Sequence, residues 1–272
     1  MAQLYWADEG GLPPDDRGLA YGDGLFETIR IDDGRAPMLA YHLDRMVSDA
    51  RRLGITIGRS ELDGVVRQAL ARYSGPEATA RCVFKLILTR GSGGRGYRPG
   101  PGMLPNLLVS HSPSPPLPAE EGVKVDFSRI PLTVNPLFSG IKSLNRLEQV
   151  MASRELQGDL FEVLMANPAG HIVEGTRTNL FVEMDDGWVT PPTDSLAVAG
   201  VMRRFVLERL RNAGEAAMEQ PVLPEDLLGG RCRGVYLTNS VLGVVPVRSL
   251  AGQDLPVAGR LATICAPNTT TE

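Results

Sequence analysis

The sequence has few residues of the kinds that most often bind metals or act as nucleophiles: three cysteines, three histidines and three lysines in 272 residues. Cys82, Cys232 and Cys265 stand far apart, are odd in number and form no metal-ligand spacing, which argues against structural zinc and suits a reducing compartment. No apolar run approaches the roughly 20 residues of a membrane helix, and the first residues show neither a basic leader nor an apolar signal core. We therefore expect a soluble, cytoplasmic protein that needs no metal.

Charge and composition exclude further classes. A net charge of -4 gives no reason to expect a nucleic acid or a membrane as partner. The hydrophobic share of 43% and the charged share of 22% are ordinary for a globular protein. His42, His111 and His171 have no acid and nucleophile at useful spacing, which disfavours a histidine-based hydrolase.

Hydrophobic periodicity predicts helices and strands in both halves of the chain. Helices are expected over 39–53, 60–70, 143–157 and 201–210, and strands over 30–33, 82–89, 107–110, 161–165, 171–173, 179–183, 188–190, 234–238 and 244–247. The stretch 111–121 is too proline-rich for a helix or a central strand and is typical of a linker. The chain is thus predicted to be α+β, with an N-terminal domain over 1–110 and a C-terminal domain over 122–272.

The scarcity of lysine leaves three candidates if the chemistry needs an amine. Lys85 and Lys124 lie among strand-like residues at positions that favour solvent exposure. Lys142 follows turn residues in NPLFSGIKSLNRLEQV and is expected at the entrance of a helix, where backbone N–H groups disfavour the charged amine and lower its pKa. From position alone, Lys142 could equally be an exposed lysine near a helix start, and both interpretations stay open.

Several segments suit an anion or carry an acid. Glu174 follows a short predicted strand in HIVEGTRTNLF. Residues 199–202, at the start of a helix, and the polar loop 238–240, after a strand, are of the type that binds phosphate. Each of these segments is also explained by ordinary capping or turn formation.

The motifs occur together in one order: DRGLAYGDGLFETIR, YHLDR, TRGSGGRGY, IKSLNRLEQV, HIVEGTRTNLF, AGVMRRF and LTNSVLGVVPV. In this order the chain resembles, over nearly its full length, the fold type IV pyridoxal-phosphate enzymes. Among them, GDGLFET, RGSGGRGY and K-x-L-N-R-L-E-Q resemble the lyases of 4-amino-4-deoxychorismate. The resemblance implies a small N-terminal α/β domain, a larger C-terminal pseudo-barrel domain, a cofactor site between them and a homodimer.

The resemblance also implies roles for single residues. Lys142 matches the Schiff-base lysine, and Glu174 matches the carboxylate on the pyridine nitrogen of pyridoxal 5'-phosphate. The residues that match the phosphate contacts are Arg45, Gly200, Val201, Met202, Asn239 and Ser240. For Arg45 the competing interpretation is a surface partner of Asp49 or Tyr41 on the same helix.

Substrate contacts are expected from a glycine-rich loop and a strand. TRGSGGRGYRPG must be a loop, in which Arg95 and Tyr97 can contact a substrate, and an arginine fork suits the carboxylates of a dianion. The alternative is a flexible surface loop with an incidental arginine. Thr28 and Arg30 match a strand that borders the active site in these enzymes, and the Thr28 hydroxyl could assist proton transfer.

The implied activity is a lyase reaction in folate biosynthesis that converts 4-amino-4-deoxychorismate to 4-aminobenzoate and pyruvate. An aminotransferase of the same fold type, acting on branched-chain or D-amino acids, would use the same lysine, glutamate and phosphate contacts. Leu147, where branched-chain aminotransferases end a glycine-rich segment in tyrosine, favours the lyase. A cofactor-binding homologue without catalysis is a further alternative. Arg177 departs from the resemblance, because small residues are usual at its position.

Overall fold

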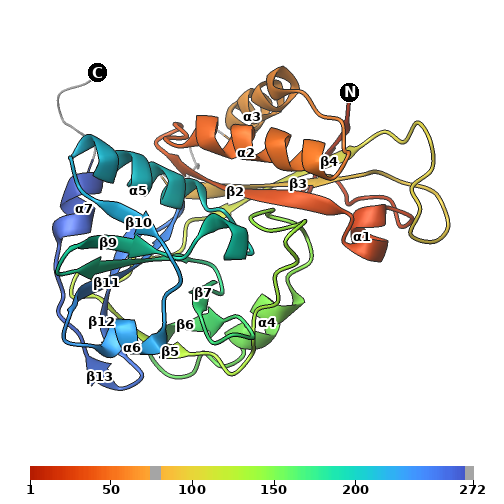
Figure 1. Cartoon of the computed structure of the whole chain (residues 1–272). Helices are drawn as coiled ribbons and strands as arrows, with labels where there is room; N and C mark the ends of the chain where they lie inside the picture. The colour runs from red at the N-terminus through yellow and green to blue at the C-terminus, as the bar shows by residue number, and fades with distance from the viewer. Residues whose placement is uncertain (74–80, 267–272) are drawn as a thin grey trace. The chain divides into compact units, whose positions relative to one another are not determined.

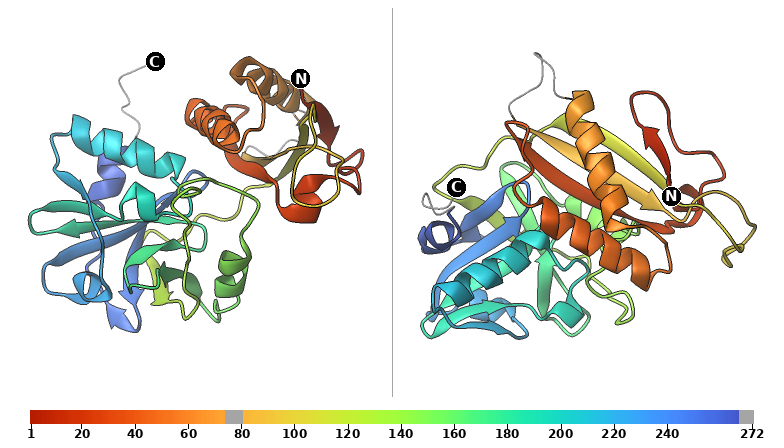
Figure 2. Two further views of the ribbon diagram at one scale, coloured as in Figure 1. Left: turned by 45° about the vertical axis from the view of Figure 1, so that its right-hand side comes forward. Right: turned by 90° about the horizontal axis from the view of Figure 1, so that it is seen from above.

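The computed structural model describes residues 1–73 and 81–266 and divides into two compact units (Figures 1 and 2). Unit 1 is Met1–Pro115 with Ile141–Asn145, and unit 2 is Pro116–Gly140 with Arg146–Glu272. Lys142 therefore belongs to unit 1 with the short segment Ile141–Asn145, whereas the residues on both sides of that segment belong to unit 2.

Unit 1 is a sheet covered by helices. Its described strands are β1 (Gln3–Trp6), β2 (Gly24–Asp32), β3 (Arg81–Thr89) and β4 (Asn106–Pro113), in the order β1-β4-β3-β2. Strands β2, β3 and β4 are antiparallel, and β1 is parallel to β4. Its helices are α1 (Arg17–Tyr21), α2 (Leu39–Arg52) and α3 (Arg59–Tyr73), of which α2 and α3 cover one face of the sheet (Figure 1). Alternation along β2 buries Leu25 and Ile29 in the same core as Leu43 and Met46 of α2.

Unit 2 is built on a curled sheet that in the described residues has nine strands, in the order β10-β9-β8-β11-β12-β5-β6-β7, with β13 on β12. The strands are β5 (Val123–Phe127), β6 (Leu160–Ala166), β7 (Ile172–Gly175), β8 (Asn179–Met184), β9 (Gly187–Thr190), β10 (Ala217–Glu219), β11 (Cys232–Asn239), β12 (Gly243–Leu250) and β13 (Gln253–Asp254). The helices are α4 (Leu147–Ser153), α5 (Val201–Asn212), α6 (Pro224–Leu228) and α7 (Arg260–Cys265), with a 3-10 turn at Thr193–Ser195. Two apolar clusters, one around Val182 and Leu237 and one around Val163 and Leu196, form the core of this unit.

The α+β, two-unit prediction is confirmed, and so are the helices expected near 39–53, 60–70 and 201–210. The helix expected over 143–157 is wrong in extent, because α4 spans only Leu147–Ser153. The strand expected over 30–33 begins six residues earlier, at Gly24. Strand β4 runs to Pro113, so the first residues of the expected linker are paired with β3.

None of the helices in the described part of the chain combines the length and the apolar character needed to cross a bilayer.

Candidate active site

Lys142 lies on a short extended segment that runs along β2. The N–H of Phe26 donates to the Lys142 carbonyl at 3.1 Å, and the N–H of Leu144 donates to the Gly24 carbonyl at 3.0 Å. The expected position at a helix entrance is wrong, because α4 begins five residues later, at Leu147. A helix N-terminus therefore does not act on the Lys142 amine; pairing with β2 has replaced the helix that local propensity favoured.

The Lys142 amine lies against the sheet. Its Nζ is 4.1 Å from the centroid of the Phe26 ring, within the range of a cation–π contact. Side chains two residues apart on a strand share a face, so Phe26, Thr28 and Arg30 project on the same side of β2. The structure thus places three predicted residues, Lys142, Thr28 and Arg30, along one face of unit 1. The Arg30 guanidinium also forms an ion pair with Asp32 at 2.9 Å.

The backbone of Lys142 is fixed by a buried acid, Asp49, which the sequence suggested only as a surface partner of Arg45. The Lys142 N–H donates to Asp49 Oδ2 at 3.2 Å, and Asp49 on α2 is only 6% exposed. Burial raises the pKa of the Asp49 carboxyl to about 6, against the lowering effect of the Lys142 N–H and Arg45. The sequence did contain a signal for this burial: Asp49 lies on the apolar side of an amphipathic helix, one turn after Arg45.

Arg45 forms a buried bidentate pair. Its Nε and Nη2 donate to the two oxygens of Glu27 at 2.7 and 2.6 Å, and His42 Nδ1 lies 2.6 Å from Glu27 Oε2. Burial raises the pKa of the Glu27 carboxyl. The charge of Arg45 and the contact with His42 lower it by more, so the resulting pKa is about 2. The Arg45 side chain is 11% exposed, so Arg45 does not lie on the surface as the alternative assumed, although its charge does act on Asp49. Glu27 alternates with Thr28 along β2 and points to the opposite face.

In unit 2, the side chains of Glu174 and Asn179 bind the two main-chain polar groups of one residue, Val198. Glu174 is buried in β7, and its Oε2 accepts from the N–H of Val198 at 3.1 Å. Asn179 Nδ2 donates to the Val198 carbonyl at 3.0 Å. The segment that leads into α5 is therefore oriented from both sides.

Gly200 is the N-cap of α5 and has no capping side chain of its own. A Cβ on Gly200 would lie 2.0 Å from Asn179 Oδ1, so only glycine fits this close approach. The first N–H groups of a helix, here those of Val201 and Met202, have no partner within the helix, and such groups bind phosphate. Just before them, Ala199 donates its N–H to the Gly140 carbonyl at 2.9 Å.

The polar loop after β11 is a side-chain-supported turn. Asn239 Oδ1 accepts from the N–H groups of Val241 and Leu242 at 3.0 and 2.8 Å, and its Nδ2 donates to the Arg177 carbonyl at 3.4 Å. The Asn239 side chain thus shapes the turn that carries Ser240. The Arg177 guanidinium lies over the Phe161 ring and donates to the carbonyl of that residue at 2.9 Å.

Glu162 is another buried acid, which sequence reasoning missed because it lies in an ordinary-looking strand. It accepts from the hydroxyls of Thr176 and Thr178 at 2.6 and 3.2 Å and from the N–H of Arg177 at 3.3 Å. The N–H of Val163 donates to the same carboxylate at 3.1 Å, so four donors converge on Glu162. Three of the four belong to the loop between β7 and β8, and these bonds fix that loop.

The glycine-rich loop, residues 91–105, connects β3 and β4 in unit 1. The Tyr97 side chain is 85% exposed, and Arg95 is exposed as well. Gly91 has a φ of +102°, and a Cβ there would lie 1.9 Å from the Leu104 carbonyl oxygen. The loop conformation thus depends on glycine where its two ends meet.

Comparison with known proteins assigns this architecture to a class. Residues 24–250 match the class IV aminotransferase family, and the chain belongs to that family. It is 32% identical over 260 residues to an aminodeoxychorismate lyase from Vibrio harveyi, covering 92% of this chain and 93% of the relative. The crystal structure of 4-amino-4-deoxychorismate lyase from Pseudomonas aeruginosa matches with a TM-score of 0.87 and 36% identity, covering 94% and 93% of the two chains.

An aminotransferase shares the fold at lower identity. A hypothetical aminotransferase from Mycobacterium tuberculosis, solved in a PLP-bound form, matches with a TM-score of 0.77 and 24% identity, covering 94% of this chain and 90% of that chain.

Proposed function

We propose that the protein is a pyridoxal-phosphate-dependent lyase that converts 4-amino-4-deoxychorismate to 4-aminobenzoate and pyruvate in folate biosynthesis. The observation that carries the proposal is the fixation of Lys142, whose backbone bonds to Asp49 and Phe26 while its amine lies over the Phe26 ring on the Thr28 face of β2. The similarity to two lyases over more than nine-tenths of the chain supports this substrate.

The cofactor is pyridoxal 5'-phosphate, and the residues present fit it. A helix that begins at a glycine too crowded for a Cβ offers its N–H groups to a phosphate, and Glu174 is a buried acid near the same segment. In the proposal, Gly200, Val201, Met202, Asn239 and Ser240 hold the phosphate, and Arg45 contributes to it with N–H donors other than the two that bind Glu27. Glu174 faces the pyridine nitrogen, and Lys142 supplies the amine. When bound, this cofactor supplies an electron-accepting ring that stabilises the charge left when a bond at the amine-bearing carbon breaks.

The chain's own residues then have two tasks. The Lys142 amine removes the proton from the ring carbon that bears the substrate amine, and the enolpyruvyl group leaves from the ring with its oxygen, to become pyruvate. Because the product ring is aromatic, the elimination is favourable, and the protein has mainly to position the base and supply a proton. Thr28, on the Lys142 face of β2, is the group we assign to assist that proton transfer.

Substrate carboxylates are assigned to Arg95, Tyr97 and Arg30. Arginine presents a planar fork that matches a carboxylate, and the exposed glycine-rich loop carries two of the three residues. The proposal also takes the homodimer from the resemblance and the cytoplasmic location from the three scattered cysteines, which suit a reducing compartment.

An aminotransferase acting on branched-chain or D-amino acids is the second candidate. It is favoured by the description of the matching family, class IV aminotransferases, because the two reactions share one fold. Pyruvate release from aminodeoxychorismate without a keto acid supports the lyase. Transamination that depends on a keto acid, without pyruvate release from aminodeoxychorismate, supports the second candidate.

The lysine assignment is tested by Lys142→Ala. Removing the amine should abolish both turnover and the visible absorbance of the bound cofactor, because no other group in the proposal can replace it. Lys85→Ala is the matched control, since Lys85 Nζ also lies near the Phe26 ring, at 5.2 Å, but on an exposed position of β3. Lys85→Ala should keep the absorbance; full activity in Lys142→Ala would refute the assignment.

A further inference from the structure

The glycine-rich loop 91–105 has little packing of its own. Residues 94–102 are all exposed, and Gly91, Gly93, Gly94, Gly96 and Gly102 adopt positive φ. A glycine-rich segment of this kind loses much backbone entropy when it is ordered, so contacts from elsewhere must hold it.

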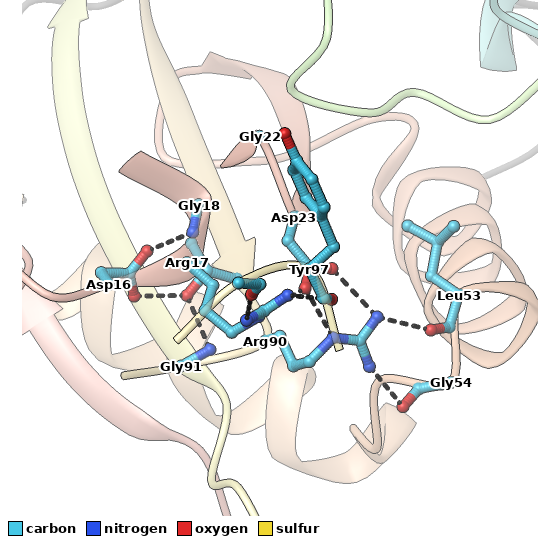
Figure 3. A network of polar contacts seen from close by, with 12 residues as sticks. Asp16, Arg17, Gly18, Gly22, Asp23, Leu53, Gly54, Arg90, Gly91 and Tyr97 are labelled. Carbon is cyan, nitrogen blue, oxygen red and sulfur yellow. Dashed lines mark hydrogen bonds and ion pairs between the residues drawn. The ribbon is translucent and has the colours of Figure 1, made fainter. Parts of the chain in front are cut away.

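Arg17 makes such contacts. It is the first residue of α1 and is only 2% exposed, and its Nη1 and Nη2 donate to the carbonyls of Gly96 and Tyr97 at 3.0 and 2.7 Å (Figure 3). Its guanidinium also lies over the Tyr21 ring at 4.8 Å, and Tyr21 meets Tyr97 edge to face at 5.5 Å. One buried side chain thus holds two consecutive peptide groups beside the exposed Tyr97 ring.

Asp23 joins Arg17 to the rest of unit 1. Its Oδ2 accepts from Arg17 Nε at 2.9 Å and from Arg90 Nε at 2.7 Å, and its Oδ1 accepts from Arg90 Nη2 at 2.9 Å. Arg90 in turn donates to the Leu53 and Gly54 carbonyls, at the end of α2. Burial raises the pKa of the Asp23 carboxyl, but the hydrogen bonds from Arg90 and Arg17 outweigh it and hold that pKa below its usual range. The loop is therefore connected through two ion pairs to α2.

The base of the loop is tied separately by Asp16. Its Oδ2 accepts from Thr89 Oγ1 at 2.6 Å and from Asn106 Nδ2 at 2.7 Å. Its Oδ1 caps α1 by accepting from the N–H of Gly18 at 2.7 Å (Figure 3). Since Thr89 ends β3 and Asn106 begins β4, Asp16 joins the two strands where the loop leaves the sheet. The base of the loop can thus stay closed without Arg17, which acts on the tip.

Burying an arginine is costly, and its ion pair does no more than offset the loss of hydration unless further donors are satisfied. Arg17 directs two of those donors to main-chain carbonyls of an exposed loop, where water could serve equally well. Stability alone does not account for this arrangement, whereas a requirement for one loop conformation does.

We infer that Arg17 is a positioning residue that holds loop 91–105 in the conformation that presents Arg95 and Tyr97 to the substrate. The inference rests on the proposed function for the role of the two loop residues. The anchoring itself does not depend on which amine the enzyme uses.

The first measurement is limited trypsin digestion of the holoenzyme. Arg95 is exposed and is followed by glycine, whereas Arg98 precedes proline and is a poor site, so cleavage between residues 95 and 96 reports on the loop. Arg17→Met keeps an unbranched side chain and removes the donors. Loss of two charge-assisted hydrogen bonds should raise the rate of this cut at least about tenfold, because cleavage follows the population of the released loop. An Arg95→Gln background, in which the cut disappears, identifies the fragments.

Arg203→Met is the matched control for digestion. Arg203 is equally buried, but in unit 2, where it donates to Glu219 and the Pro191 carbonyl. Its loss should leave the cut after Arg95 at the wild-type rate. An equal increase in both variants would mean general destabilisation and would overturn the inference. If Arg17→Met does not fold, Arg17→Lys keeps a cation for Asp23 but cannot span both carbonyls, and it should still raise the cleavage rate.

The second measurement is kinetic. Arg17→Met should raise KM for aminodeoxychorismate about tenfold, with kcat within about threefold of wild type and an unchanged cofactor spectrum, because the reacting groups stay in place. Faster cleavage with an unchanged KM would overturn the positioning role, as would an unchanged cleavage rate. If the wild-type enzyme instead proves to be an aminotransferase, the proposed function fails by itself; the cleavage arm stands, and KM for the amino acid substrate replaces that for aminodeoxychorismate.

Discussion

Asp49→Asn should stabilise the protein, which is unusual for a buried polar residue in contact with the proposed active-site segment. Asp49 is 6% exposed, and burial raises the pKa of its carboxyl from 3.8 to about 6. An asparagine removes the charge and retains an amide oxygen that can accept the N–H of Lys142, which now donates to Asp49 Oδ2 at 3.2 Å.

The sign follows from proton binding. Between pH 3.8 and about 6 the folded carboxyl holds its proton more tightly than the unfolded one, so the stability falls as the pH rises through this window. A pKa difference of about two corresponds to about 3 kcal/mol of stability lost once Asp49 is ionised. We take this as an upper limit, and expect Asp49→Asn to gain about 1–3 kcal/mol near pH 8 and close to nothing near pH 4.

The assay is urea unfolding of the two proteins near pH 8 and near pH 4. The midpoint should rise for Asp49→Asn at the higher pH with an unchanged slope, and if two transitions appear, the affected one should be that of unit 1. Asp44→Asn is the control on the same helix, because Asp44 is 51% exposed and should change stability by less than about 0.5 kcal/mol. A destabilised Asp49→Asn near pH 8, or a gain that does not depend on pH, would show that the ionised carboxylate is favoured in the folded state and refute the reasoning.

Two further outcomes concern charged residues of unit 1. Glu27→Gln leaves Arg45 buried without its carboxylate partner, and should cost about 3 kcal/mol at pH 7 in the same unfolding assay. Because the pKa of Glu27 is lowered to about 2, the difference from wild type should persist above about 4.5 and shrink as the pH falls towards 2; a difference that grows on acidification would contradict the pairing. Arg95→Ala should raise KM for aminodeoxychorismate about tenfold with the cofactor spectrum unchanged. Loss of the visible absorbance in that variant would instead assign Arg95 to the cofactor phosphate.

Local patterns predicted the elements whose burial is periodic. Helices α2 and α5 appear in the sequence as apolar stripes, and strand β3 as a β-branched run, so their positions could be predicted to within a few residues. The segment 141–145 is different, because its neighbours along the chain favour a helix while its backbone groups pair with β2, more than a hundred residues away. Tertiary contacts of this kind leave no local signal.

The partners of buried charges were equally hidden. Arg45 was singled out as an anion contact from the resemblance, but its bidentate pairing with Glu27 depends on the packing of α2 against β2. Asp23 lies 67 residues from Arg90, and only the fold shows that Arg17 and Arg90 share the carboxylate of Asp23. Motif similarity can name residues that act together, whereas the geometry that makes them act requires the folded chain.

Residues of the motif that favoured a lyase make structural contacts within the chain. In K-x-L-N-R-L-E-Q, Asn145 Nδ2 donates to the Gly22 carbonyl at 3.1 Å, and Glu148 accepts from the N–H of Thr133 at 3.1 Å. Gly22 has a φ of +65°, and a Cβ there would lie 2.5 Å from Asn145 Oδ1, so the end of α1 and the Lys142 segment fit each other. The contact of Asn145 holds the lysine segment in place, and an aminotransferase needs the same lysine held as firmly. The choice between the two reactions therefore depends on the substrate contacts, and the loop that carries Arg95 is where a difference between them should be sought.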